Sequence, residues 1–597
     1  MILQALHDYY ARKPELPRDG FELKDIPFVI ELEADGRPVQ ILDTRELVGK
    51  RKQARGFLVP QGVKKSVNVA ANLLWGNAEY VLGIADAKKL AERQAKGKET
   101  EYRARLTEMR AAFIEEIRHL PEAAQQDGGV QAVLAFAQLG GDEIVAALGE
   151  LGSEISETNP NLTFRLRSDV DLVCQRPAVS AAIMKRGAPS SALHCLVSGE
   201  MDEIERLHSS ISGVRDAQSS GASLVSFNLD AFCSYGKDQG RNAPVGKRAA
   251  FAYTTALKHL LRRDSPQKLQ VGDTTTVFWA DHETSLENDF AVMFDEPRKD
   301  DADPDRGTRA VAALLSAVRQ GVGPVLDDKT RFFVLGLAPN AARIAIRFWL
   351  TGTVADMTKR IVRHFDSICI DPPKHDPQFL SLQLLLRSIA TPSKKWPGGD
   401  PENIPPNLAG EVMRAVLEGL PYPETLFGGA IRRIRAQRDV NYPRAAILKA
   451  CLNRKRTPYE KEITVSLDKE NANPGYRLGR LFAVLERIQE EAAGGPGKIN
   501  ATIRDRYYGA FSATPATVFA TLMRMKNHHL AKLDNPGRRV NLEKLVGEIV
   551  DGLMPTLPAH LPLADQGRFA IGYYHQRQDF FTKRESVITD PSITAKE

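Results

Sequence analysis

The stretch DPPKHDP, residues 371–377, divides the chain into two parts with different patterns of hydrophobic residues. Before it, short alternating apolar runs are mixed with helix-length patterns, which predicts strands and helices together. After it, nearly every segment to about residue 553 has helix-length apolar periodicity interrupted by proline and glycine. We therefore expect an α+β protein, with a mixed α/β N-terminal region at 1–375 followed by an all-helical C-terminal part. The helical part divides into a basic helical region at 376–470 and a bundle at 471–597.

Several N-terminal segments predict individual elements. Residues 2–10 have apolar residues at helical spacing, and residues 87–149 are rich in Ala, Glu, Arg and Leu, so both should be largely helical. Alternating residues around Asp35-Gly36 predict a β-hairpin. The further strands that we predict are 78–84, 161–173, 223–228, 274–280 and 331–337.

The composition, 43% hydrophobic and 26% charged over 597 residues, is typical of a globular protein with several domains. No run of about 18 apolar residues occurs, so we expect no membrane-spanning helix, and the start of the chain does not have the pattern of a secretory signal. No two of the five cysteines form a Cys-x-x-Cys pair. This favours reduced thiols in a reducing, cytoplasmic compartment.

The positive charge is concentrated in the last third of the chain. The net charge is +6, and from residue 376 onward 32 Lys and Arg face 24 Asp and Glu. Much of this excess lies in one run that contains a single acid, Asp439. Its basic residues are Arg432, Arg433, Arg435, Arg438, Arg444, Lys449, Arg454, Lys455 and Arg456. Such a run suits a polyanion. The alternative is a solvated helix face whose acids come from neighbouring elements.

One long segment, 226–261, holds polar side chains among glycines and aromatics in a pattern that suits contact rather than catalysis. The part from 235 to 242 should be a loop, and a helix should begin at Pro244. The polar side chains of the loop and of the first helical turn are Lys237, Gln239, Arg241, Asn242, Lys247 and Arg248. Asn and Gln can pair with base edges, while Lys and Arg reach phosphates. A capping loop with no ligand is the alternative.

A second polar segment follows the predicted strand at 331–337. The turn at Pro339-Asn340 precedes Arg343 and Arg347, which would lie one helical turn apart. This pattern indicates either the start of a helix that faces an anion or a strand–turn–helix packing element with two solvent-facing arginines.

Catalytic patterns are weak throughout the sequence. His7-Asp8 lacks further metal ligands, and the adjacent residues of Asp281-His282-Glu283 would point to opposite sides of an extended chain. Gly494–Lys498 lacks the glycine spacing and the hydroxyl residue of a phosphate loop. The sequence therefore offers no strong catalytic constellation, and we expect no metal and no cofactor. A metal-dependent nuclease that uses His7-Asp8 or Asp281-His282-Glu283 is the alternative.

The chain also resembles a known family over almost its whole length. The stretches that carry this resemblance are MILQAL (1–6), NLLWGNAEYVLG (72–83), CLVSGE (195–200), SGASLVSFNLDAFCSYGKDQGRNAP (220–244), TTVFWA (275–280), LGLAPNAARIAIRFW (335–349) and GYYHQRQDFF (572–581). Each is weak alone, but in this order they resemble the large subunit of the type I-C CRISPR surveillance complex, Cascade. Two positions depart from the family pattern: Ala71, where a proline is expected, and Gly76, where an acid is expected.

The resemblance implies a subunit without catalytic activity. Its N-terminal part would inspect the protospacer-adjacent motif (PAM) on double-stranded DNA, contact the 5′ handle of the guide RNA, and promote duplex opening and R-loop formation. Its C-terminal bundle would resemble the Cascade small subunit and hold displaced DNA. The implied partners are guide RNA, target double-stranded DNA, the displaced single strand, the backbone and guide-processing subunits, the small subunit and a separate helicase-nuclease. A structural assembly subunit that touches only RNA is a further alternative.

Under this resemblance, the stretch KKSVNVAANLLWGNAEYVLG, residues 64–83, would face the DNA duplex. The side chains expected to hold phosphates there are Lys64, Lys65 and Ser66. The amides expected to include base-edge contacts are Asn68, Asn72 and Asn77, with hydrogen bonding inside the loop as the alternative. We expect Trp75 in the core. The DNA backbone would be contacted by Lys247, Arg248, Arg343, Arg347, Arg432, Arg433, Arg435, Arg438, Arg454, Lys455 and Arg456.

Overall fold

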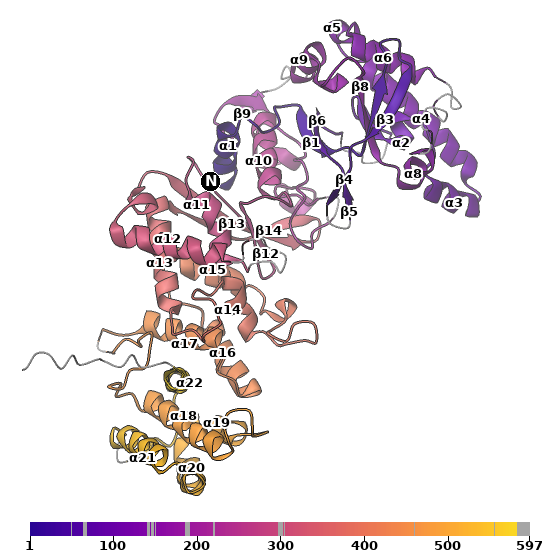
Figure 1. The fold of residues 1–597 in the computed structure, drawn as a ribbon. Helices are drawn as coiled ribbons and strands as arrows, with labels where there is room; N and C mark the ends of the chain where they lie inside the picture. The colour runs from indigo at the N-terminus through magenta and orange to yellow at the C-terminus, as the bar shows by residue number, and fades with distance from the viewer. Residues whose placement is uncertain are drawn as a thin grey trace, which may run out of the picture. The chain divides into compact units, whose positions relative to one another are not determined.

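We describe the protein from a computed structural model. It describes residues 1–48, 51–63, 69–139, 144, 149, 151–185, 192–218, 221–296, 303, 305–458, 460–553 and 556–581. The chain forms two compact units, and Figure 1 labels many of their helices and strands. The first contains residues 3–209 and 226–257, and the second contains residues 210–225 and everything from 258 onward.

The first unit is built around a four-stranded mixed sheet in the order β3-β2-β8-β7. Strand β2 (Phe28–Leu32) pairs antiparallel with β3 (Pro38–Asp43) and parallel with β8 (Asn161–Leu166), and β7 (Trp75–Asn77) pairs antiparallel with β8. The tight turn between β2 and β3 places Gly36 at φ +90°, which glycine adopts without steric cost. Helices α2 and α6 pack on this sheet, and α4 packs on both helices (Figure 1).

The other elements of the first unit surround this sheet. Two-stranded ribbons are β1 (Phe21–Asp25) with β6 (Gly56–Pro60), β4 (Glu46–Val48) with β5 (Arg51–Gln53), and β9 (Ala192–His194) with β10 (Met201–Glu203). The helices are α1 (Ile2–Arg12), α2 (Ala78–Val81), α3 (Ala87–Ala95), α4 (Glu99–Arg118), α5 (Glu122–Gln125), α6 (Gly128–Ala137), α8 (Leu151–Thr158), α9 (Pro177–Lys185) and most of α10 (Lys247–Leu260). Short 3₁₀ helices are η1 (Val173–Gln175), η2 (Asp230–Phe232) and η3 (Gln239–Asn242).

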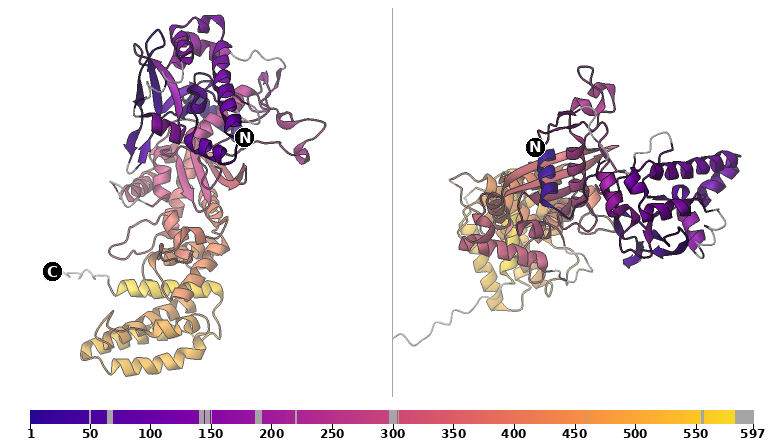
Figure 2. Two further views of the ribbon diagram at one scale, coloured as in Figure 1. Left: turned by 90° about the vertical axis from the view of Figure 1, so that its right-hand side faces the viewer. Right: turned by 90° about the horizontal axis from the view of Figure 1, so that it is seen from above.

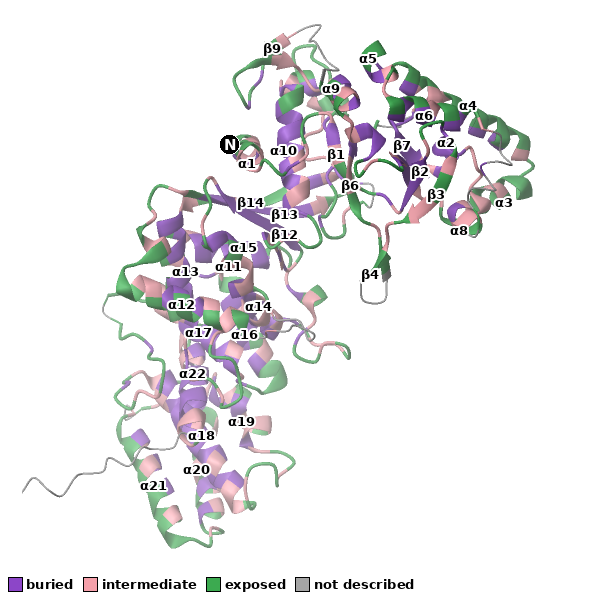
Figure 3. Ribbon diagram, turned by 45° about the horizontal axis from the view of Figure 1, so that its top comes forward, coloured by how far each residue is buried: buried purple, intermediate pink, exposed green. Residues whose placement is uncertain are grey.

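The second unit begins with an antiparallel sheet in chain order, β11 (Lys268–Val271), β12 (Thr274–Ala280), β13 (Arg331–Asn340) and β14 (Arg343–Thr353). Strand β12 is buried along its whole length, as Figure 3 shows. Its Phe278 packs on Phe290 of α11 (Leu286–Phe294) and on Phe332 of β13. These aromatic contacts pack α11 against the sheet. The next helices of the unit are α12 (Arg306–Gln320) and α13 (Val354–Ile368), with η4 (Gly323–Leu326) between them.

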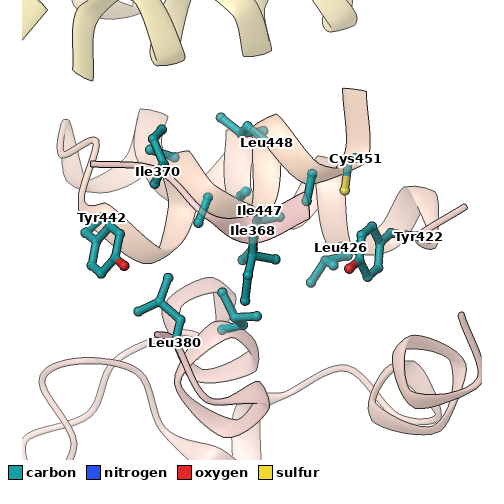
Figure 4. Packing of buried hydrophobic residues seen from close by; sticks show 14 of the residues in the cluster. Ile368, Ile370, Leu380, Tyr422, Leu426, Tyr442, Ile447, Leu448 and Cys451 are labelled. Carbon is teal, nitrogen blue, oxygen red and sulfur yellow. The ribbon is translucent and has the colours of Figure 1, made fainter. Parts of the chain in front are cut away.

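After the proline-rich stretch the second unit is entirely helical over its described residues. The first group of helices is α14 (Leu382–Ile389), η5 (Pro401–Asn403), α15 (Leu408–Glu418), α16 (Glu424–Gln437) and α17 (Tyr442–Lys455). Ile368, Leu426 and Ile447 meet between these helices (Figure 4). They leave a void of only about 10 Å³, so this layer is close-packed.

The remaining helices form the C-terminal bundle, seen in orange and yellow in Figure 2. They are α18 (Pro474–Ala492), α19 (Ile503–Phe511), α20 (Pro515–Leu530), α21 (Pro536–Asp551) and α22 (Leu563–Asp579). Helices α18 and α22 approach very closely: a Cβ on Gly479 would lie 2.0 Å from the Phe569 carbonyl oxygen, and a Cβ on Gly572 would lie 2.1 Å from that of Tyr476. Helix α22, the last in the described residues, also packs on α17 and so joins the two helical layers of this unit.

The α+β architecture is confirmed, with mixed α/β structure first and helices in the C-terminal half. The hairpin around Asp35-Gly36 and the strand at 274–280 are confirmed. The predicted strand at 78–84 is wrong, because Asn77 caps a helical turn, α2, instead. The predicted strand at 223–228 is also wrong, since only isolated bridges form at Ala222 and Ser223.

None of the helices in the described part of the chain combines the length and the apolar character needed to cross a membrane.

Candidate nucleic-acid interface

The loop from Asp230 to Asn242 is held in one shape by the side chain of its last residue. Asn242 Oδ1 accepts a hydrogen bond from the Ser234 backbone N–H at 2.9 Å. Its amide nitrogen donates to the Lys237 carbonyl at 2.9 Å and to the Gln239 carbonyl at 3.0 Å. Asn242 therefore acts here as a positioning residue that stiffens the loop.

Gln239 lies where this loop meets the segment after β10. Its φ is +44°, and its side-chain Oε1 accepts a hydrogen bond from Arg206 Nη1 at 2.8 Å. The other end of the amide, its NH₂ group, is the end that can donate to a ligand. The next residue must be small, because a Cβ on Gly240 would come within 2.1 Å of the Glu205 carbonyl oxygen. Sequence reasoning missed Arg206, since nothing in its own neighbourhood indicates a partner on the loop.

A cavity of about 860 Å³ opens beside this loop. Its polar lining is of mixed charge: Arg206, Arg241 and Gln239 provide donors, while Glu203, Asp230 and Asp238 provide carboxylates. Lys237 and Arg241 are exposed. The arrangement offers both donors and acceptors to a polar ligand and cations to an anionic one.

The basic start of α10 is engaged in ion pairs with the strand β10 region. The helix begins at Lys247 rather than at Pro244. Lys247 Nζ lies 2.8 Å from Glu203 Oε1, and Arg248 Nη2 lies 3.3 Å from Glu200 Oε2. Both cations are exposed, so these pairs contribute little to stability.

A second cavity, of about 520 Å³, has these two cations in its lining together with a group of carboxylates. The carboxylates are Asp19, Glu116, Asp202, Glu203 and Glu205. Burial raises the pKa of Asp19 above its usual range, as does the nearby charge of Asp202 to a smaller degree. With five carboxylates against Lys247 and Arg248, the lining of this cavity is net negative, which makes it a poor phosphate site.

The stretch at 64–83 is only partly described. Lys64, Lys65, Ser66 and Asn68 lie outside the described residues. Asn72 is buried, and its Oδ1 accepts a hydrogen bond from the Val63 N–H at 3.0 Å.

A second asparagine of this stretch, Asn77, stabilises the fold. Asn77 caps α2, accepting from the Tyr80 N–H at 3.4 Å and donating to Glu79 at 3.3 Å. Trp75 is confirmed in the core, where its indole N–H donates to the Pro60 carbonyl at 2.8 Å. The amides of Asn72 and Asn77 are thus engaged within the protein.

Arg343 and Arg347 lie on strand β14, so both interpretations of this segment as a helix start are wrong. The turn after Pro339 closes a β-hairpin, because Ala341 adopts φ +51° and the chain returns antiparallel to β13. Farther from the turn, the register between the two strands shifts between Gly336 and Leu337 of β13, and Arg347 of β14 is the extra residue of a β-bulge. Its guanidinium lies 3.3 Å from Asp273 Oδ2.

Part of the basic run at 432–456 is buried inside the helical layer, so the run does not form one solvent-facing cluster. Arg444 is 3% exposed and donates to the carbonyls of Ser388 and Asp439, both at 2.9 Å. Lys449 is 2% exposed and donates to the Ser367 carbonyl at 3.1 Å. Burial lowers the pKa of the Arg444 guanidinium to about 10, and burial also lowers the pKa of Lys449. These two cations stabilise the fold.

The end of the run is also partly engaged within the protein. Arg454 stacks over the Tyr422 ring at 4.1 Å and donates to the Leu420 carbonyl at 2.8 Å. Lys455 forms an ion pair with Glu424, and Arg456 donates to the Glu460 carbonyl at 2.9 Å. These contacts connect the end of α17 to the segment between α15 and α16, to the start of α16 and to the segment after α17.

Three arginines at the end of α16 and at its C-cap are exposed: Arg432 and Arg435 lie about one turn apart on the helix, and Arg438, the C-cap, adopts a left-handed conformation with φ +56°. We call Arg432, Arg435 and Arg438 the α16 stripe. Arg435 donates to Gln566 Oε1 at 2.7 Å, and Arg438 lies 4.0 Å from Asp505. Arg433, between them, is half-buried. The stripe is a group of three exposed cations at the end of α16, which suits a polyanion.

In each of the two candidate metal-binding motifs, the histidine lies close to the aspartate next to it in the sequence. His7 Nδ1 lies 3.4 Å from Asp8, and His282 Nδ1 lies 3.0 Å from Asp281. Asp281 Oδ1 also accepts a hydrogen bond from the Arg331 N–H at 2.9 Å. Among the described residues, no three His, Cys, Asp or Glu side chains are grouped so that they could hold a metal ion.

The chain matches a protein-family model over almost its whole length. The family model described as CRISPR-associated protein (Cas_Csd1) matches residues 6–581. The chain belongs to the Cas_Csd1 family. This confirms the resemblance to a CRISPR protein at the level of the family, and the match extends from the first helix to the end of α22. A search of curated proteins found no match.

For a Cas_Csd1 protein, the loop with Gln239 and the α16 stripe are the two described surfaces that best suit nucleic acid. The first combines an oriented amide with exposed cations, and the second holds three exposed guanidinium groups. They lie in different compact units.

Proposed function

We propose that the protein is the non-catalytic large subunit of a type I-C CRISPR interference complex of the Cascade kind, acting in the cytoplasm. In this role it recognises the PAM in double-stranded DNA, promotes duplex opening and R-loop formation, and supports recruitment of a separate helicase-nuclease. The further partners in this proposal are the guide RNA, the displaced strand, the backbone and guide-processing subunits and the small subunit. Membership of the Cas_Csd1 family supports the CRISPR setting.

The observation that carries the DNA-reading role is the stiff loop from Asp230 to Asn242. A short sequence tag is read most selectively by side chains that are already oriented, because ordering a mobile loop costs free energy on binding. The side chain of Asn242 provides that order, and Arg206 orients the Gln239 amide. Lys237 is exposed on the same loop and can reach a phosphate.

The α16 stripe supports a second part of the role, which is to hold the backbone of a peeled or guide-paired strand. Single-stranded nucleic acid is bound largely through rows of cations that neutralise successive phosphates. Arg432, Arg435 and Arg438 are three such exposed cations at the end of α16.

A binding experiment with the assembled ribonucleoprotein tests this proposal. Duplexes with one target sequence complementary to the guide RNA and with randomised flanking bases are incubated with the complex, and the bound fraction is sequenced. We expect a strong preference for a small set of flanking sequences on one side of the target. Equal recovery of all flanking sequences would instead favour a structural subunit that touches only RNA.

A cleavage assay tests the non-catalytic part of the proposal. The purified chain is incubated with labelled duplex and single-stranded DNA in the presence of Mn²⁺, and we expect the DNA to stay intact. Cleavage that is lost in His7→Ala or His282→Ala variants would favour the nuclease alternative.

A further inference from the structure

Tyr235 is the most exposed of the large hydrophobic residues in the described part of the chain. Its exposed fraction is 98%, compared with 91% for Val170, the next in order. Most tyrosines in globular proteins bury much of their ring, because the ring is the larger, apolar part of the side chain. A ring that contacts almost nothing in its own chain suggests contact with another molecule.

The backbone holds Tyr235 at the tip of a tight turn. The Lys237 N–H donates to the Ser234 carbonyl at 3.0 Å, and the two central residues have φ values of +53° for Tyr235 and +67° for Gly236. Two successive positive φ values are those of a type I′ turn, in which Asn, Asp and Gly are preferred at both positions. A tyrosine there is conformationally unfavourable, so its ring is present despite a backbone that favours other residues.

The same turn is fixed from both ends. The Asn242 side chain binds the N–H of Ser234 on one side of the tip and the carbonyl of Lys237 on the other. The aromatic ring is therefore presented on a support that is ordered before any ligand binds. Binding then costs less conformational entropy than it would with a mobile loop.

The surroundings of the ring favour nucleic acid over a protein partner. Aromatic anchors of protein interfaces are surrounded by further residues that exclude water. The residues next to Tyr235 in the chain are exposed: Ser234, Lys237 and Asp238 are polar, and Gly236 has no side chain. A lone ring beside a lysine matches the two requirements of single-stranded nucleic acid, which are a stacking surface and a cation for the phosphate.

We propose that Tyr235 is a stacking residue that receives one unpaired nucleobase of the target DNA next to the PAM. This inference rests on the proposed function and assigns the tip of the loop a task different from that of Gln239. Every base has a π face, so stacking on Tyr235 is independent of base identity and contributes affinity for opened DNA. The Gln239 amide distinguishes base edges and contributes selectivity.

The test compares ring-removing and ring-keeping substitutions in the assembled ribonucleoprotein. We expect Tyr235→Ala to weaken binding of PAM-containing duplex on the order of ten-fold, by a similar factor for every flanking sequence that the wild type accepts. Tyr235→Phe and Tyr235→Trp should bind within about two-fold of wild type, because each keeps a stacking ring. Val170→Ala is the matched control, since it removes another highly exposed apolar side chain of the same unit.

Photocrosslinking adds a readout that detects stacking directly. Duplexes carry 5-iodouracil at single positions on either side of the PAM, and the crosslinked peptide is identified by mass spectrometry. We expect a crosslink to Tyr235 at one or two positions, retained in Tyr235→Phe and lost in Tyr235→Ala.

The outcomes separate this inference from the proposed function. A wild-type complex that binds all flanking sequences equally overturns the proposed function itself. A wild type that discriminates, together with unchanged binding by Tyr235→Ala and no crosslink, overturns only the stacking role. A Tyr235→Ala variant that fails to assemble with the other subunits would show that the ring docks on protein, which also overturns it.

Discussion

Arg206 Nη1 donates a hydrogen bond to Gln239 Oε1 across 2.8 Å, which fixes the direction of the Gln239 amide. A side-chain amide has one accepting and one donating end, so holding the carbonyl orients the NH₂ group. The two residues come from different segments of the first unit, one after β10 and one in η3. Their contact orients the Gln239 NH₂ group as a hydrogen-bond donor in the lining of the cavity of about 860 Å³.

The first prediction concerns this donor. Gln239→Glu keeps an acceptor for Arg206 but removes the NH₂ group, so the assembled complex should lose discrimination between flanking sequences. We expect the preferred duplex to lose about 0.5–1.5 kcal/mol relative to others, the range for one hydrogen bond, because Arg206 already occupies the Gln239 carbonyl. Competition binding measures this difference. Gln94→Ala, an exposed glutamine of α3, is the control, and unchanged discrimination in Gln239→Glu would rule out base reading by this residue.

The second prediction concerns the stiffness of the loop. Asn242→Ala removes three hydrogen bonds that connect the loop to itself. We expect trypsin to cleave after the exposed Lys237 faster than in the wild type, because proteolysis requires a mobile segment. The midpoint of global unfolding should change little, since the residue lies outside the hydrophobic cores. If the rate of cleavage after Lys237 is unchanged, the loop is held by other contacts.

The third prediction distinguishes direct DNA contact by the α16 stripe from a general effect of the protein's net charge. Replacing Arg432, Arg435 and Arg438 together by Gln should weaken binding to all DNA sequences and reduce the slope of log affinity against log salt by about 2–3. The control replaces three exposed arginines of α3 and α4, Arg93, Arg103 and Arg105, which gives the same change in charge. Equal effects of the two triple variants would mean that long-range potential, not contact, is responsible.

The fourth prediction is a loss of stability in mild acid. Burial lowers the pKa of His364 to about 3 and that of His575 to about 4. In the unfolded chain both titrate near 6.5, so below that pH the unfolded state binds more protons and the free energy of unfolding falls as the pH falls. Each histidine contributes up to about 1.4 kcal/mol per pH unit between about 6.5 and its folded pKa.

Thermal unfolding between pH 7 and pH 5 measures this effect. The double variant His364→Gln, His575→Gln should unfold at lower temperature at pH 7, because it disturbs hydrogen bonds to Tyr422 and Tyr476, but with a flatter pH dependence. His528→Gln, at an exposed position, should keep the wild-type slope. A double variant with the full slope would assign the acid sensitivity to other groups.

The fifth prediction concerns the contact between α18 and α22. Gly479→Ala places a Cβ against the Phe569 carbonyl and should destabilise the second unit by about 1–3 kcal/mol, the usual cost of overpacking. Gly509→Ala is the opposite case, because that glycine of α19 is exposed and an added Cβ would meet no atom within 4 Å, so it should stabilise by about 0.5–1 kcal/mol. Equal melting temperatures for the two variants would contradict the close approach of the helices.

The candidate site could be predicted only in outline. The segment 235–242 is recognisable as a polar loop from its glycines and amides, but its partner Arg206 has no signal in the sequence. The spacing of Arg343 and Arg347 suggests a helix wrongly, because residues four apart share a face both on a helix and on a strand. The basic run suggests one surface, although Arg444 and Lys449 point inward to carbonyls of the preceding helices.

The sequence by itself determined the α+β class, with mixed α/β structure first and helices in the C-terminal half, because hydrophobic periodicity is a local property. It also determined the hairpin at Asp35-Gly36 and the burial of Trp75. Only the tertiary structure decided which cations are buried, which amides cap helices and which residue orients Gln239. Those outcomes depend on carbonyls and carboxylates brought from distant parts of the chain, and the pairing of such groups has no local periodicity from which it can be read.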